Sequence, residues 1–178
     1  MATEQLKAFS EEHNHAVGNL NSLKVKTVAN GAIVENADID NFTLVQLSFN
    51  ADGERVARQL SAVTNKSYLI AAPETRYMGE AMTDFYNAVG DRARIVVLEA
   101  AYTRFETSAY SLNTGVTEIT NGQVAHFDPA TKKFIISASG TPHVDYANAS
   151  AKFLVVSNEE DIAYTFGKPM VRFEVIEA

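Results

Sequence analysis

The sequence contains 178 residues, 46% of them apolar and 21% charged, which is the composition of an ordinary globular protein. A chain of this length buries roughly 70% of its unfolded surface, so it can form a hydrophobic core without a disulfide or a structural metal. Because cysteine is absent, disulfides and thiolate metal sites are excluded, and a net charge of −7 with scattered basic residues argues against direct nucleic-acid binding.

Residues 1–22 are the most polar part of the chain. Their larger side chains recur at spacings of three and four, which is typical of one helix face, and these are Leu6, Phe9, His13, Val17 and Leu20. We expect a short helix or an ordered arm over residues 1–22, with a frayed terminus as the alternative. The segment lacks the basic start and apolar centre of a signal peptide, and no stretch reaches the roughly 20 apolar residues of a membrane span. We therefore expect no membrane partner.

From residue 23 onward the apolar period changes to two, which is typical of half-buried strands. We therefore expect a β-rich domain over residues 23–178. The Asn30-Gly31 pair predicts a tight turn. The strands expected in this half of the chain are 23–27, 32–34, 42–49 and 68–72.

Two segments of the first half show a helical rather than an alternating pattern. Residues 53–63 have apolar side chains at helical spacing, and Glu54 stands four positions before Arg58, but a loop fits the segment equally well. Residues 80–89 predict a short helix whose C-cap is Gly90. One or two short helices are therefore expected.

The second half of the chain predicts strands throughout. They are expected at 93–98, 104–112, 115–120, 123–127, 133–139, 152–156 and 171–175. Many short strands at this spacing, with one or two short helices and an N-terminal arm, predict a mainly β fold that is a β-barrel or a sandwich. A doubly wound nucleotide-binding fold is disfavoured because no alternation of strand and helix occurs.

The tripeptide His13-Asn14-His15 contains the three residue types after which a family of nucleases with a ββα metal site is named. In such enzymes the three residues are spread over the motif instead of being adjacent. We therefore interpret it as a solvated polar stretch.

Asn36, Asp38 and Asp40 have the spacing that opens a calcium-binding loop. Such a loop requires glycine at its sixth position and glutamate at its twelfth, where this chain has Asn41 and Leu47. The pattern therefore predicts a polar turn before the strand that follows.

Two sets of carboxylates are candidates for binding or acid–base chemistry. Glu159, Glu160 and Asp161 form a run whose charges repel one another, which predicts a solvated loop, with contact to a partner's basic patch as the alternative. Glu99 and Glu106 could pair across strands, but the sequence does not give their register. We interpret both as exposed strand carboxylates.

His126 and His143 are each followed two positions later by an aspartate, Asp128 or Asp145. A histidine–aspartate pair is one part of a hydrolase triad, but no serine stands in the G-x-S-x-G context of a nucleophile. A hydrolase is therefore the least favoured of the functions considered.

Other nucleophile and phosphate-binding signals are also incomplete. Ser137 and Ser139 stand in an expected strand and not at a sharp turn. Gly167-Lys168 is followed by Pro169, which removes a backbone donor that a phosphate loop would need. We therefore expect no catalytic residue, no cofactor and no metal ligand, and a protein that is not an enzyme.

Aromatic residues gather in the middle third of the chain. Most are expected in the core, but a few exposed tyrosines would suit a binding face. This favours a β-barrel module for a small ligand or a glycan as the alternative function. The residues concerned are Tyr77, Phe85, Tyr86, Tyr102, Phe105 and Tyr110.

The stretch that starts at Lys66 carries a frame of recurring segments. A strand that ends in Ala-Pro-Glu is followed by MTDFYNAVGDRAR, by the aromatic strand TRFETSAY, by NGQVAHFDPATKKFIIS and by a terminal strand. Over roughly residues 42–177 this frame resembles the head decoration (cement) proteins of tailed phages. Residues 1–22 lie outside the resemblance, and the family has no active residues to carry across.

The resemblance implies a structural virion protein. It would be made in the host cytoplasm, bind the outer surface of the phage capsid through the major capsid protein, and stabilise the shell. A homo-oligomer such as a trimer is expected on the capsid. Strand edges and an N-terminal arm can add to a neighbour's sheet, and many copies on one lattice add avidity to modest contacts.

Overall fold

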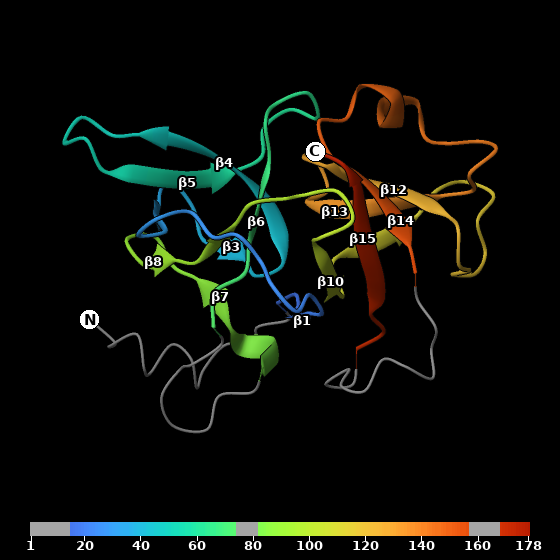
Figure 1. The fold of residues 1–178 in the computed structure, drawn as a ribbon, viewed down its shortest axis with the longest axis horizontal. Coiled ribbons are helices and arrows are strands. Elements are labelled where there is room, and N and C mark those ends of the chain that lie inside the picture. Colours follow the sequence, from blue (N-terminus) through green and yellow to red (C-terminus); the bar gives the residue numbers. More distant parts are fainter. Residues whose placement is uncertain (1–14, 74–81, 157–167) are drawn as a thin grey trace.

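The structure is a computed structural model that describes residues 15–73, 82–156 and 168–178. Two curved β-sheets lie side by side in it, which confirms the mainly β fold expected from the alternating pattern (Figure 1). Helical structure within the described ranges is confined to two short 3-10 turns, η1 (Met82–Asp84) and η2 (Val144–Asn148). None of the described helical segments is long and apolar enough to cross a membrane.

The seven-stranded sheet is curled into a nearly closed barrel. Its strands, in spatial order, are β1 (Gly18–Leu20), β10 (Arg104–Thr107), β15 (Val171–Glu177), β14 (Lys152–Val155), β12 (Val124–Asp128), β13 (Lys133–Ser137) and β11 (Tyr110–Leu112). β10 and β11 are two parts of one segment, yet β10 pairs with β15 near one edge and β11 pairs in parallel with β13 at the other. A single segment therefore joins the two ends of the sheet.

The six-stranded sheet uses the same arrangement. Its strands are β8 (Arg92–Ala93), β2 (Ala32–Val34), β5 (Arg55–Gln59), β4 (Thr43–Phe49), β6 (Tyr68–Ile70) and β9 (Ile95–Val96). β8 and β9 form the two edges, although only Arg94 separates them along the chain. The Arg94 carbonyl accepts from the backbone of Ala71 at 3.0 Å, and its guanidinium donates back to the Ala71 carbonyl at 2.6 Å. A small sheet of β3 (Ile39–Asp40) and β7 (Tyr86–Asn87) completes the fold.

The fold has two apolar cores, and the first of them also takes in Leu44, Leu69 and Val96 from the six-stranded sheet. The seven-stranded sheet is filled by phenylalanines whose ring centroids lie 5.1 to 5.9 Å apart in tilted or edge-on pairs, a geometry that stabilises by about 0.5–1.5 kcal/mol per pair beyond area burial. They are Phe105, Phe127, Phe134, Phe153 and Phe173. The second core is aliphatic and includes Val34, Ile39, Val45, Ile70 and Ile95.

Most expected strands are confirmed, with changes at their ends. β2, β4, β6, β12, β13, β14 and β15 lie where alternation predicts them. The expected strand 93–98 is broken at Arg94, and the expected strand 104–112 is broken at Ser108-Ala109. Both breaks fall where one segment passes from one side of a sheet to the other, from β8 to β9 or from β10, next to the edge strand β1, to β11.

Of the short helix or ordered arm expected over residues 1–22, the helix is wrong for residues 15–22. Gly18–Leu20 forms β1 and pairs antiparallel with β10. A Cβ on Gly18 would lie 2.3 Å from the Glu106 carbonyl oxygen, so the close approach of the two strands requires glycine there. Val17 is fully buried beside it. The other residues of the expected helix face, Leu6, Phe9 and His13, lie outside the described residues.

Residues 53–63 contain a strand, β5, in place of the helix or loop expected. Val56 and Ala57 are both fully buried, because β5 lies between β2 and β4 inside the sheet, and this hides the alternation. Glu54 and Arg58 do not pair with each other. Arg58 pairs with Glu35, and Glu54 pairs with Arg92 on β8.

The helix expected over residues 80–89 is also wrong in its described part. Only η1 is helical, and β7 follows it. The reason is tertiary, since the Asn87 side chain is buried and donates to the Ile39 carbonyl at 3.1 Å while β7 pairs with β3. Gly90 lies in a turn with φ of 92°.

Two expected strands do not form. In residues 23–27 only Thr27 makes an isolated bridge, to Val96, and Leu23 is fully exposed. Residues 115–120 are irregular, because the Gln123 side chain donates to the Glu118 carbonyl and accepts from the Thr120 amide. These local bonds replace the pairing that a strand would require.

Candidate functional site

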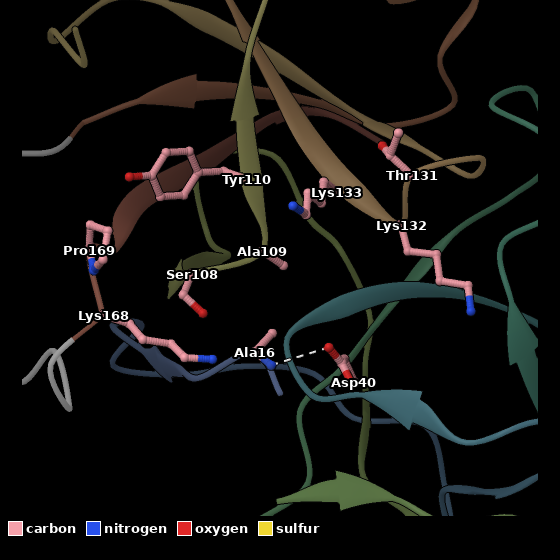
Figure 2. A pocket seen from close by; sticks show the side chains of 10 residues that line it. All are labelled: Ala16, Asp40, Ser108, Ala109, Tyr110, Thr131, Lys132, Lys133, Lys168 and Pro169. Atoms are coloured by element: carbon pink, nitrogen blue, oxygen red, sulfur yellow. Dashed lines mark hydrogen bonds between the residues drawn. The ribbon is translucent and has the colours of Figure 1, made fainter. Parts of the chain in front are cut away.

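A groove beside the junction of β10 and β11 gathers three lysines on a protein with a net charge of −7 (Figure 2). We call it the lysine groove and define it by Lys132, Lys133, Lys168, Asp40 and Tyr110. Its volume is about 580 Å³. That is within the range of sites for small molecules or for a short stretch of a partner chain.

The turn between β12 and β13 positions two of the lysines. The Asp128 carboxylate accepts from the backbone of Ala130 at 3.0 Å and from both the backbone and the hydroxyl of Thr131. Burial acts to raise the pKa of Asp128, but these hydrogen bonds outweigh it and lower the pKa. Lys132 then adopts a positive φ of 57°, and Lys133 begins β13. A side-chain-capped turn thus fixes the backbone from which Lys132 and Lys133 extend at the groove.

Lys168 enters the groove from the segment that leads into β15. Its ammonium donates to the His15 carbonyl oxygen. Burial lowers the pKa of Lys168, and the nearby Asp40 carboxylate partly offsets this. Lys168 is thus held in place by the chain near β1 rather than extending freely into solvent.

Asp40 is the acidic member of the groove, and it already has partners. Its carboxylate contacts His15 Nδ1 at 2.6 Å. It also accepts from the Ala16 amide at 3.2 Å, the bond drawn in Figure 2. One engaged carboxylate facing three lysines leaves the groove with an excess of positive charge. Because lysine offers a flexible point charge instead of a rigid fork, the groove suits carboxylates or other anions without imposing one geometry.

The nuclease-like and calcium-like patterns do not form metal sites among the described residues. His13 and Asn14 lie outside the described residues, and His15 contacts Asp40. Asp38 accepts from the Val89 amide at 2.9 Å, so the carboxylates of Asp38 and Asp40 have different partners. The polar turn expected at Asn36 is present, with a φ of 76° at that residue.

The candidate carboxylates separate in the same way. Glu99 pairs with Lys26. Glu106 is 2% exposed instead of lying on the surface as expected, and it pairs with Arg172. The run Glu159, Glu160 and Asp161 lies outside the described residues, and so does Gly167.

The histidine–aspartate patterns behave differently from each other. Asp128 is occupied by its own turn, whereas His126, His143 and Asp145 come together. Ser137 lies near them, but its hydroxyl oxygen accepts from the His143 backbone amide at 3.1 Å. The spacing in the sequence pairs each histidine with its own aspartate, whereas the fold groups His126 with His143 and Asp145.

The aromatic residues divide as expected between core and surface. Phe85 and Phe105 are buried, Tyr86 and Tyr110 are half-buried, and Tyr102 is 71% exposed. Tyr77 lies outside the described residues. Tyr110 is the tyrosine of this set that lines the lysine groove.

Sequence reasoning missed the lysine groove. In the sequence, Lys132 and Lys133 are one of several scattered basic pairs, and Lys168 is part of an incomplete phosphate loop. The charge of the groove arises because β13 and the start of β15 flank the same junction. No local signal in the sequence brings these lysines together.

The profile of the YonC prophage protein family matches residues 11–176 of the chain. This chain belongs to the YonC prophage protein family. It is 64% identical, over the full length of both chains, to the SPbeta prophage-derived uncharacterized protein YonC of Bacillus subtilis (strain 168). No solved structure matches the chain. The phage origin implied by the resemblance is thereby supported, and the members of this family place the protein among prophage-encoded proteins.

Proposed function

We propose that this prophage-encoded protein is a capsid decoration protein, which binds the outer surface of the phage head and stabilises the shell without catalysing a reaction. In this proposal the lysine groove receives an acidic segment of the major capsid protein. The observation that carries it is the placement of three lysines around one groove of an acidic protein whose Asp40 is already engaged.

Charge complementarity supports this use of the groove. An acidic protein is repelled by an acidic shell surface except where its own charge is locally reversed, so the groove would fix the orientation of docking as well as attract the partner. Affinity per copy can be modest, because a homo-oligomer on a lattice gains avidity. Binding the assembled shell and not its separate subunits stabilises the shell by mass action.

The experiment is co-sedimentation with undecorated heads of the phage that encodes the protein. The wild-type chain should sediment with heads at micromolar concentration. The double variant Lys132→Glu/Lys133→Glu should bind at least about tenfold more weakly, which corresponds to 1.4 kcal/mol. Raising the salt concentration should weaken wild-type binding, because exposed charges are screened.

A matched control separates the groove from net charge. Lys24→Glu/Lys66→Glu changes the charge by the same amount at two exposed lysines outside the groove and should retain binding. Equal loss in both double variants would exclude the groove as the docking site. Wild-type protein that fails to sediment with heads would exclude the decoration function. Thermal stabilisation by an acidic oligosaccharide in that case would favour the ligand- or glycan-binding alternative.

A further inference from the structure

His126 on β12 is a buried histidine without a hydrogen bond. It is 0% exposed, and neither ring nitrogen has a hydrogen-bond partner among the described residues. Its neighbours Ala125 and Phe127 belong to the phenylalanine core, so strand alternation places His126 on the opposite face of the sheet. Leaving a buried polar group unsatisfied costs about 1–3 kcal/mol, and such a group requires an explanation.

The segment that covers His126 supplies two further ligand groups. The His143 ring stacks on the His126 ring with centroids 5.1 Å apart and planes at 25°. His143 is the N-cap of η2, and its Nδ1 lies 3.6 Å from the Asp145 carboxylate. One ligand atom from each of the three residues lies within 4.8 Å of the others.

These separations are close to those of a metal site. Tetrahedral zinc with bonds of about 2.05 Å places its ligand atoms about 3.3 Å apart, so small side-chain rotations would bring the three groups to one ion. The side chains of His143 and Asp145 are 28% and 48% exposed, which gives an ion access from solvent. His126 closes the inner side.

We propose that His126, His143 and Asp145 form a binding site for a divalent transition-metal ion, with zinc the best match. Two imidazoles and one carboxylate are the ligands of zinc sites, whereas calcium and magnesium prefer oxygen ligands alone. The three protein groups leave a further coordination position to solvent. The ion would join the η2 segment to β12.

Two features of the surroundings prepare the site. Burial, and to a lesser degree His143, lower the pKa of His126, a direction that favours the neutral imidazole that metals bind. The backbone of His143 is held in place by the buried Ser137 hydroxyl, whose oxygen accepts a hydrogen bond from the His143 amide. The same oxygen accepts from the Asn113 side chain at 3.1 Å. A ligand held this way loses less freedom on binding.

The test is metal binding by the full-length protein after chelator treatment. Isothermal titration should give about one zinc ion per chain, and saturating zinc should raise the unfolding midpoint by at least about 5 °C. Magnesium and calcium at the same concentration should not. Cobalt should give the visible absorption of a low-symmetry site, which is a readout independent of stability.

His143→Ala and Asp145→Ala both replace partly exposed side chains, so they should fold and should weaken zinc binding by more than about 100-fold, beyond the loss seen for outer-shell partners. His15→Ala and Asp52→Ala are the matched controls and should bind zinc as the wild type does. The proposal is overturned if the wild type binds no zinc at micromolar concentration, or if His143→Ala and Asp145→Ala bind it as tightly as the controls do. It is independent of docking to heads, which is measured separately.

Discussion

Glu106 on β10 and His126 on β12 are buried on the same seven-stranded sheet, on the face opposite the phenylalanine core, but their hydrogen bonding is opposite. The Glu106 carboxylate accepts from Arg172 Nε at 2.9 Å and from a second guanidinium nitrogen at 2.6 Å. Asn19 and Asn21 donate to it at 3.2 and 3.1 Å. His126 has no hydrogen-bond partner in the described part of the chain.

The difference shows that the Glu106 carboxylate has a structural role, whereas the ring nitrogens of His126 are free to bind a ligand. Asn19, Glu106 and Arg172 stand directly opposite one another on β1, β10 and β15, so their bonds fix the register of three strands. A buried charge of this kind is tolerated because its lone pairs are filled within the fold. The His126 ring packs against His143, but its two nitrogens have no hydrogen-bond partner among the described residues and remain available to a ligand.

The largest effect is expected when Glu106 loses its charged partner. Arg172→Met leaves the carboxylate buried and unpaired, so the free energy of unfolding should fall by about 3–5 kcal/mol, measured by urea denaturation. Arg104→Met is the matched control, since Arg104 pairs with Glu174 on the same two strands but at a more exposed position. It should cost at most about 1 kcal/mol, and equal losses in the two variants would contradict the comparison.

Glu106→Gln should have a smaller effect in the same direction. The amide keeps the shape of the side chain but removes the charge that strengthens the bonds from Arg172. We expect a loss of about 2 kcal/mol in the free energy of unfolding by urea denaturation, because hydrogen bonds to charged groups contribute about 1.5–3 kcal/mol. A change within error would mean that the charge of Glu106 contributes nothing to the three-strand register.

His126→Leu should have the opposite sign in chelator-treated protein. Leucine fills a similar volume and removes both unsatisfied nitrogens, so the metal-free chain should gain about 1 kcal/mol in the free energy of unfolding. Zinc should no longer stabilise this variant. A loss of stability without metal would show that the imidazole makes a contribution to packing that outweighs its missing hydrogen bonds.

The smallest effect is expected at the edge of the Glu106 network. Asn21→Ala removes one donor at an exposed position and leaves the others in place, so the cost should be about 0.5 kcal/mol. Chemical denaturation beside Arg172→Met would measure it. A cost approaching that of Arg172→Met would show that the asparagine, not the arginine, is the main partner of the carboxylate.

Much of the fold can be predicted from local pattern. β4, β12 and β15 combine alternation with clear breaks such as the Asp128 turn, so their positions follow from the sequence. β5 is missed because it lies between β2 and β4 with Val56 and Ala57 both buried, and β7 is missed because it has two residues and is fixed by its pairing with the distant β3. Alternation of apolar and polar residues identifies a strand with one buried face, and it disappears when both faces of the strand are buried.

The candidate sites show the same limit. Spacing associates His126 with Asp128 and His143 with Asp145, but the fold keeps the second association and replaces the first with a contact between the histidines. The lysine groove is missed because Lys168 is distant in sequence from Lys132 and Lys133. Both groupings depend on how β12, β13 and β15 are placed relative to one another.

The sequence by itself determined the mainly β character, the acidic charge and the positions of the regular strands, because side-chain alternation and turn residues act over a few neighbours. Only the tertiary structure decided that β10 and β11, and likewise β8 and β9, stand at different places in one sheet. It also decided that Glu106 is satisfied while His126 is not. The physical reason is that strand pairing and buried hydrogen bonds join residues far apart in the chain, and a local pattern carries no information about which of them will meet.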